Sequence, residues 1–103
     1  MNRYTAQGIA ADISGGQNVV VIPAPYGTVQ NLLHQIGEHT DENYTSVSHT
    51  YSTITDVSGG RVSINHNTER LRGLRIDVLV VPDKLDAEEF RFLLKPDTEL
   101  IFY

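Results

Sequence analysis

The stretch L-R-G-L-R-I-D-V-L-V-V-P-D-K-L-D, residues 71–86, carries the clearest fold signal in the chain. Its centre, Ile76 to Val81, is apolar apart from Asp77, which is typical of a strand buried on both faces. Pro82 ends this strand, because proline has no N–H to donate to a strand ladder. Asp83 follows as the first acid after the strand. A second run, N-V-V-V-I at residues 18–22, has the same character, and together the two runs indicate a parallel sheet.

The rest of the chain alternates between helix and strand signals. Ala6 and Ile9 begin an i, i+3, i+4, i+7 pattern behind the possible cap Thr5, and Val29 begins another behind Thr28. The polar run 38–48 is expected to be a loop, and the glycines at 59 and 60 indicate a hairpin. The expected elements are helices over 6–13, 29–36 and 87–94, and strands over 18–22, 49–56, 61–65, 75–81 and 99–103.

This order indicates an α/β fold in one domain, residues 1–103. Strands that alternate with helices favour right-handed crossovers and a three-layer sandwich. We expect a mostly parallel sheet of four or five strands with an added β-hairpin. Asp86 and Glu89 have the spacing of a capping box for the last helix. Asp77 lies inside the expected strand 75–81 and is expected to be a hydrogen-bonded strand-end residue.

Composition excludes several classes of function. The net charge of −5 opposes broad attachment to nucleic acid or to anionic membranes. The chain has no cysteine, which excludes disulfides and thiolate metal sites. No apolar run approaches the roughly 20 residues that span a bilayer, and the first 16 residues lack a signal-peptide core. We therefore expect a cytoplasmic protein that does not bind membranes.

Positive charge is concentrated in one segment. The arginines there are Arg61, Arg70, Arg72 and Arg75, and Glu69 is the only acid among them. The cluster is a candidate contact for nucleic acid or another anion. The alternative is that these are ordinary surface charges beside a hairpin.

Three segments in a fixed order resemble a known family. They are G-Q-N-V-V-V-I-P-A-P-Y at 16–26, S-G-G-R-V-S-I at 58–64 and L-R-G-L-R-I-D-V-L-V-V at 71–81. With the helices between them, they are similar to the RecA-like P-loop ATPase core, most closely to phage terminase large subunits and helicase-type motors. The resemblance covers about residues 5–95. It implies a RecA-like fold and a phage-encoded protein in the host cytoplasm.

Two departures from the family bear on activity. No Gly-x-x-x-x-Gly-Lys-Ser/Thr string occurs, so one contiguous segment cannot supply the backbone N–H groups, lysine and hydroxyl of a phosphate loop. Aligned on residues 78–81, the family's metal-holding Asp falls on Pro82 and its catalytic Glu falls on Asp83. Proline has no side-chain oxygen to hold a magnesium-bound water. The resemblance therefore implies a relative without catalytic residues, nucleotide or cofactor.

Other candidate sites are weaker. Tyr26, Gly27 and Thr28 form a possible ligand loop, because they lie between a buried strand and a helix N-terminus. No histidines have metal-site spacing, and the group His39, Asp41 and Glu42 is not expected to hold a metal. There is no G-x-S-x-G elbow for a serine nucleophile.

The leading hypothesis is a non-catalytic ATPase-like protein that acts as a protein-interaction or assembly module. Strand 99–103 is expected either to fill a vacant sheet position or to pair with a partner, most simply a second copy. An alternative is a nucleic-acid-binding accessory factor that uses the arginines of residues 61–75. A further alternative is an enzyme whose site is completed by a partner ATPase subunit.

Overall fold

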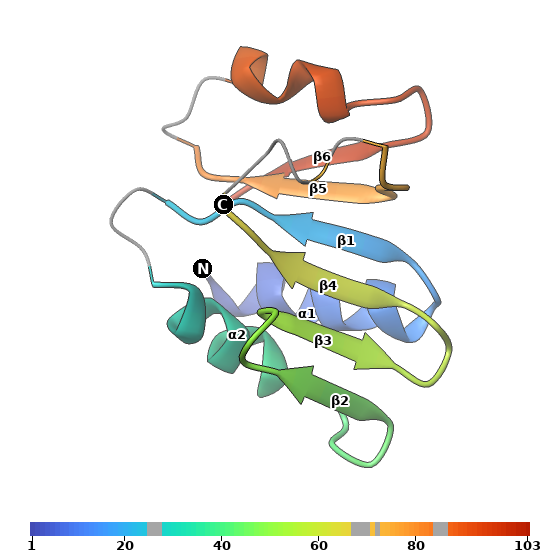
Figure 1. The fold of residues 1–103 in the computed structure, drawn as a ribbon. Coiled ribbons are helices and arrows are strands. Elements are labelled where there is room, and N and C mark those ends of the chain that lie inside the picture. The colour runs from blue at the N-terminus through green and yellow to red at the C-terminus, as the bar shows by residue number, and fades with distance from the viewer. Residues whose placement is uncertain (25–27, 67–70, 72, 84–86) are drawn as a thin grey trace.

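The computed structural model describes residues 1–24, 28–66, 71, 73–83 and 87–103. It contains one six-stranded sheet in the order β2-β3-β4-β1-β5-β6 (Figure 1). The strands are β1 (Asn18–Val21), β2 (Thr45–Ser48), β3 (Thr53–Asp56), β4 (Arg61–Ile64), β5 (Val78–Val81) and β6 (Glu99–Phe102). The helices are α1 (Arg3–Ser14), α2 (Val29–Gly37) and the 3-10 helix η2 (Ala87–Leu93).

The sheet is mostly parallel, as expected. β1 pairs in parallel with both β4 and β5, and β5 pairs in parallel with β6. β2 and β3 complete the sheet by antiparallel pairing next to β4. Because β1, β4, β5 and β6 point the same way, their carboxyl ends lie at one edge of the sheet. We call this the carboxyl edge, and the opposite one the amino edge.

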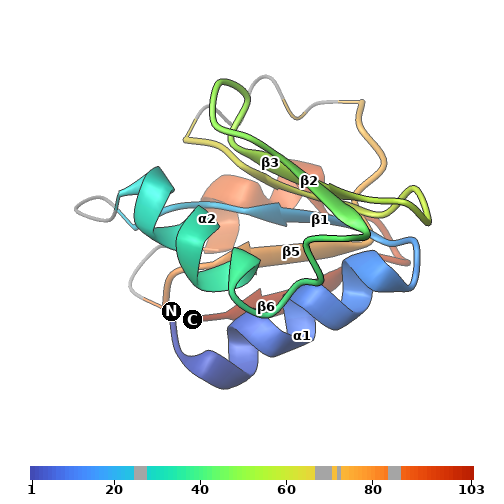
Figure 2. The ribbon, with the colours of Figure 1, turned by 90° about the horizontal axis from the view of Figure 1, so that it is seen from below.

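Helices α1 and α2 cover one face of the sheet (Figure 2). The apolar stripe of α1 is buried there as its spacing predicted. The N-cap is Asn2 rather than Thr5: Asn2 Oδ1 accepts the Thr5 N–H at 2.8 Å. Thr5 was the wrong choice because it lies in the first turn, where its own N–H needs an acceptor. Thr28 caps α2 as predicted, accepting the Asn31 N–H at 3.3 Å.

The opposite face is covered only around β1, β5 and β6, among the described residues. There η2 and Leu71 bury a second apolar cluster: Val20, Ile22, Leu71, Ile76, Leu79, Val81, Phe90 and Leu93. Over β2, β3 and β4 this face carries polar side chains: Ser46, Ser48, Thr53, Thr55, Arg61 and Ser63. We call the β2–β4 part the open face. The fold is therefore α/β, with one mostly parallel six-stranded sheet and the helices α1 and α2 on one of its faces.

Two sequence expectations were wrong around the hairpin. The run 38–48 is not all loop, because Thr45–Ser48 forms strand β2 at the edge of the sheet. Residues 49–52 do not begin a strand but form the turn between β2 and β3, with Ser52 at φ 54°. The β3–β4 hairpin itself is confirmed. The Asp86 half of the predicted capping box lies outside the described residues.

Within the described ranges, no helix combines the length and the apolar character needed to cross a membrane. The two chain termini lie close together at the carboxyl edge (Figures 1 and 2).

Candidate functional site

The carboxyl edge is where parallel α/β sheets usually bind ligands. Here the backbone of the chain itself occupies the end of β5. The N–H of Asp83 donates to the main-chain oxygen of Tyr103 at 2.9 Å, and the N–H of Tyr103 donates to the carbonyl oxygen of Val81 at 3.0 Å. Pro82 between them is buried, and the Asp83 side chain is exposed. The polar backbone groups that follow β5 are thus bonded to β6 rather than open to a ligand.

Tyr103 extends this closure across the sheet. Its hydroxyl donates to the carbonyl oxygen of Ile22 at 2.7 Å, so the end of β6 is tied to the segment after β1 although β5 lies between them. Burial raises the pKa of the Tyr103 hydroxyl, with an opposing contribution from the backbone of Ala24. Tyr103 therefore serves as a neutral hydrogen-bond donor within the fold.

A hollow of about 210 Å³ lies beside this tie. Met1, Thr28, Gln35 and Tyr103 are among its lining residues, and none of the described residues that line it has a charged side chain. Thr28 is the described member of the predicted ligand loop, and its hydroxyl is engaged in capping α2. Tyr26 and Gly27 lie outside the described residues.

Asp83, which follows β5 and Pro82, is not part of a group of potential metal ligands among the described residues. No group of three or more His, Asp or Glu side chains converges as a metal site in the part of the chain that the structure describes. This covers Asp83 and the loop group His39, Asp41 and Glu42. A magnesium site needs several oxygen ligands in near-octahedral geometry.

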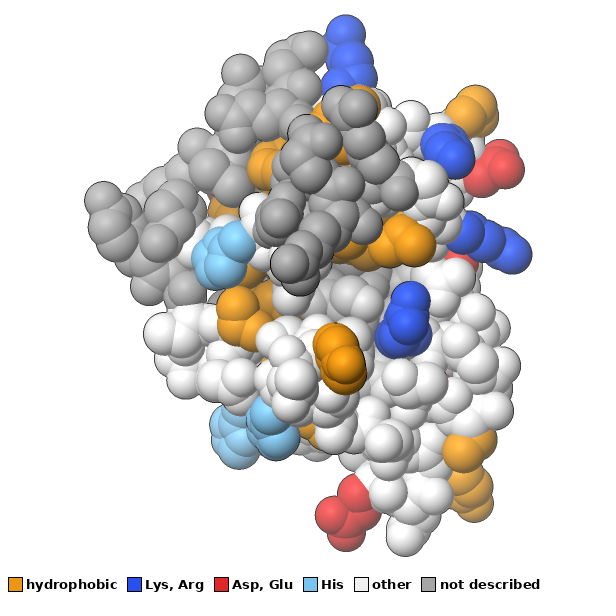
Figure 3. Space-filling model, in the orientation of Figure 1, with side chains coloured by type: hydrophobic (Ala, Val, Ile, Leu, Met, Phe, Trp, Pro, Cys, Tyr) orange, Lys and Arg blue, Asp and Glu red, His pale blue; other side chains and the backbone are white. Residues whose placement is uncertain are grey.

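The arginine cluster is brought together in part at the amino edge. Arg61 begins β4 and Arg75 precedes β5, and both line a small hollow of about 90 Å³ together with Ser63 and Leu74. Figure 3 shows Lys and Arg side chains on this side of the open face. Arg70 and Arg72 lie outside the described residues. Parallel pairing through β1 makes neighbours of two arginines that are far apart in sequence.

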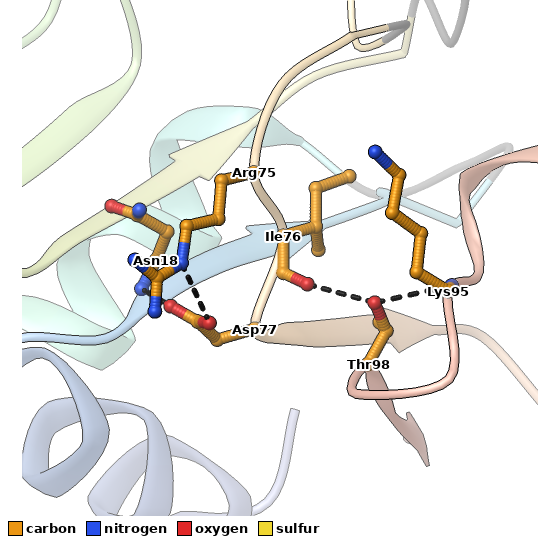
Figure 4. Close-up of polar contacts among 6 residues, drawn as sticks. All are labelled: Asn18, Arg75, Ile76, Asp77, Lys95 and Thr98. Carbon is orange, nitrogen blue, oxygen red and sulfur yellow. Dashed lines mark hydrogen bonds and ion pairs between the residues drawn. The ribbon is translucent and has the colours of Figure 1, made fainter.

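The Arg75 side chain already forms an ion pair with Asp77 (Figure 4). Its Nε lies 3.2 Å from Asp77 Oδ1, while Asp77 Oδ2 accepts the backbone N–H of Asn18 at 2.8 Å. The backbone N–H of Asp77 in turn donates to the Asn18 carbonyl at 2.9 Å. Asp77 therefore ties β5 to β1, which confirms its expected structural role.

A hollow of about 750 Å³ was not foreseen from the sequence. It lies between α1, the loop before β2 and the tip of the β3–β4 hairpin, and its polar lining includes His39, Asp41 and Asp56. Ser58 donates its N–H to Asp56 Oδ2 at 2.8 Å, and hydrogen bonds from Ser58 lower the pKa of that carboxyl. Because three separated segments build this hollow, no local motif could have revealed it.

The outer edge of β6 is a further feature with binding potential. The N–H of Glu99 donates to Asp77 and that of Tyr103 donates to Val81, so residues 99, 101 and 103 turn their backbone groups toward β5. In a parallel ladder the alternate residues, Leu100 and Phe102, then point their N–H and C=O groups away from the sheet. Phe102 is also 46% exposed. We define the β6 outer edge as these backbone groups with the Leu100 and Phe102 side chains.

Comparisons with protein-family models, with curated proteins and with solved structures returned no match for this chain.

Proposed function

We propose that the protein is a non-catalytic, RecA-like ATPase relative that acts as an interaction module and binds its partner at the β6 outer edge. The observation that carries the proposal is the row of backbone groups on Leu100 and Phe102, which has no strand beside it in the described part of the chain, together with the exposed Phe102 side chain. Such an edge accepts an extended strand through main-chain hydrogen bonds, while side-chain pockets give selectivity. We place the protein in the cytoplasm of a phage-infected cell, from the resemblance of residues 5–95 to phage motors.

The carboxyl edge supports the non-catalytic part of the proposal. Backbone bonds between Asp83, Tyr103 and Val81 fill the position where a catalytic strand end would open to substrate. Pro82 has no side-chain oxygen to offer a metal-bound water. Asp83 follows β5 as an exposed carboxylate, and one exposed carboxylate does not by itself assemble a phosphoryl-transfer site.

An ATP turnover assay tests this part. Purified protein with ATP and magnesium is expected to release phosphate no faster than buffer. Turnover that exceeds the buffer rate and is lost in the Asp83→Ala variant would contradict the non-catalytic proposal. The matched control is Asp97→Ala, which removes an exposed carboxylate from the turn before β6.

Strand binding at the β6 outer edge is tested by selecting short random peptides on the protein. Phe102→Pro removes one outward N–H and no bond to β5, and proline is tolerated on edge strands. Peptides enriched on the native chain should lose binding to Phe102→Pro and keep part of it with Phe102→Ala, which retains the N–H. Peptides that bind Phe102→Pro as well as the native chain would place the binding surface elsewhere.

A folding control keeps this test interpretable. Circular dichroism and the urea midpoint show whether Phe102→Pro retains the fold. If it does not, Phe102 can be N-methylated by semisynthesis, which removes the same hydrogen and leaves the ring in place. Loss of peptide binding in the N-methylated protein would carry the same conclusion.

A second candidate function is contact with nucleic acid at the amino edge. It is favoured by the one observation that Arg61 and Arg75 line the same hollow beside the open face. The Arg75 side chain is 82% exposed even while it pairs with Asp77. The net charge of −5 opposes this candidate. Its test is whether the affinity for nucleic acid falls as salt is added.

A further inference from the structure

We propose that the partner at the β6 outer edge is a second copy of this chain, paired antiparallel about a two-fold axis at Ile101. The inference rests on the proposed function, because it assigns an occupant to the same edge. Two-fold dimers are the commonest oligomers, and their contact must be self-complementary. The β6 sequence E-L-I-F can therefore be tested for pairing with itself.

The direction of the backbone groups selects the register. In an antiparallel pair, two directly opposed residues exchange both hydrogen bonds when their backbone groups face each other. With Ile101 on the axis, Leu100 lies opposite Phe102 of the second copy, and both residues point their groups outward. An axis at Leu100 would instead require the Thr98 N–H, which already donates to the Lys95 carbonyl at 2.9 Å. The Ile101 register thus uses both free residues and breaks no existing bond.

Side chains agree with this register on both faces. Leu100 packs against the apolar cluster under η2, and Phe102 follows it on the same face by strand alternation. The register sets the half-exposed Phe102 ring against Leu100 of the second copy, an apolar cross-strand pair. On the other face Ile101 meets its own equivalent and Glu99 meets Tyr103, so no like charges are opposed.

The opposite end of the sheet explains why β6 is the edge that pairs. β2 is also an edge strand, but its sequence is T-S-V-S and its one apolar side chain is Val47. Joining two β6 strands continues two six-stranded sheets into one and leaves only polar β2 edges outside. A two-fold contact also closes on itself, so the assembly stops at two copies.

Charge gives the dimer a characteristic response to salt. Each copy carries a net charge of −5, so two copies repel each other at low ionic strength. Added salt screens this repulsion and should strengthen the dimer. Binding to nucleic acid has the opposite dependence on salt.

Sedimentation equilibrium over a range of concentrations is the first experiment. The native chain should move from 11.5 kDa toward twice that mass as concentration rises, and more readily at higher salt. Phe102→Pro should raise the dissociation constant by about tenfold or more, because it removes hydrogen bonds from both symmetric halves. The matched control is Val47→Pro, whose N–H also points away from the sheet and whose side chain is also 46% exposed. It should dimerise like the native chain.

Cross-linking reads the register directly, since the chain has no native cysteine. In the proposed pair the two residues at position 101 are a non-hydrogen-bonded pair with Cα atoms about 4.5 Å apart, a separation that a disulfide can bridge. Ile101→Cys should therefore form a disulfide-linked dimer under mild oxidation. Glu99→Cys should form none alone but should link to Tyr103→Cys when the two variants are mixed.

The outcomes separate the two proposals. A native chain that stays monomeric at high concentration, or that dimerises equally as Phe102→Pro, overturns the second copy as occupant. If selected peptides still require the Phe102 N–H, the proposed function stands with another protein as partner. If neither peptides nor a second copy depends on Phe102, both proposals are wrong. Cross-linking of Glu99→Cys with itself would keep the dimer but contradict the register.

Discussion

The carboxylate of Asp77 accepts the Asn18 N–H at 2.8 Å and lies 3.2 Å from Arg75 Nε. In sequence it is the one acid within the buried run of residues 76–81, where it was expected to be a hydrogen-bonded structural residue. Its position at the amino edge, with an 18% exposed side chain, makes it a tie between strands instead. At the scale of one residue, the sequence shows only that a carboxylate is present. Its hydrogen-bond partners, Asn18 and Arg75, show that it has a structural role.

Replacing Asp77 separates the tie from the exposed ion pair. Asp77→Ala leaves the Asn18 N–H without its acceptor and should lower the free energy of unfolding by about 1–3 kcal/mol. Arg75→Ala removes a largely exposed ion pair and should cost less than about 1 kcal/mol. Urea unfolding of both variants measures the difference. An equal loss in the two variants would mean that the Asn18 contact contributes little.

Asp12 should make stability depend on pH with an unusual sign for a carboxylate. Its pKa is raised above the ordinary 3.8, first by burial and then by the nearby charge of Glu99. A folded-state pKa above the unfolded value means that the Asp12 contribution is most favourable at low pH and is lost as pH rises through the raised pKa. Asp12 also lies near the C-terminus of α1, where negative charge is unfavourable.

Asp12→Asn should therefore stabilise the protein at neutral pH. The helix-end effect alone suggests a gain of about 0.3–1 kcal/mol. Urea unfolding should show the largest gain near neutral pH, with the difference from the native chain shrinking as pH falls toward the ordinary value of 3.8. Glu42→Gln, an exposed loop carboxylate, is the control. A gain that stays constant with pH would show that ionisation of Asp12 is not its cause.

At the scale of elements, the sequence predicts those whose burial has a clear period. Strands β1 and β5, the β3–β4 hairpin and the apolar stripe of α1 follow from runs and spacings alone. β2 did not, because an edge strand with one apolar residue out of four has no burial pattern to detect. Helix 87–94 was expected from its capping box and from Phe90, Leu93 and Leu94, and the structure has a 3-10 helix over residues 87–93 instead. Three residues per turn place Phe90 and Leu93 on the same face.

Gly60 is where the hairpin meets helix α1. A Cβ at Gly60 would lie 1.9 Å from the Ile13 carbonyl oxygen and 2.7 Å from its carbonyl carbon. Ser58 Oγ donates to the same oxygen at 2.9 Å, so the hairpin tip is held against the end of the helix. Because both clashing atoms are backbone, they cannot be relieved by a rotamer change.

Gly60→Ala should lower the free energy of unfolding by about 1–3 kcal/mol or more, as overpacking does. Gly8→Ala is the matched control, since a Cβ there meets nothing within 4 Å and the residue lies inside α1. It should raise stability by about 0.5–1 kcal/mol through helix propensity. Chemical denaturation of the two variants gives both values. Two changes of the same sign would contradict the close approach of Gly60 to Ile13.

At the scale of the whole molecule, the candidate surfaces depend on strand order, which no local pattern contains. The sequence predicted that 99–103 is a strand but not that its outer side lies at the end of the sheet. It predicted an arginine cluster, while the meeting of Arg61 with Arg75 required β4 and β5 to flank β1. Residues could be nominated from sequence, and only topology could decide which of them share a surface.

The two candidate functions differ most clearly in how they respond to salt. The arginine hollow predicts weak binding of single-stranded DNA at low salt, with an affinity that falls steeply as salt is added. Fluorescence anisotropy should show that Arg61→Ala weakens this binding. If Arg61 contacts one phosphate, the substitution should also reduce the steepness of log affinity against log salt by about 0.7 for single-stranded DNA, or by about 0.9 for duplex DNA. Arg3→Ala removes the same charge from α1, on the other side of the sheet, and should change the affinity less.

Equal effects of Arg61→Ala and Arg3→Ala would mean that only net charge matters, and no retention at low salt would remove nucleic acid as a ligand. The β6 dimer, in contrast, should strengthen over the same salt range because it brings two chains of charge −5 together. A single titration of salt, followed by both anisotropy and sedimentation, therefore distinguishes the two surfaces. If DNA binding weakens while the sedimenting mass of the protein rises as salt is added, the amino edge and the β6 outer edge act independently.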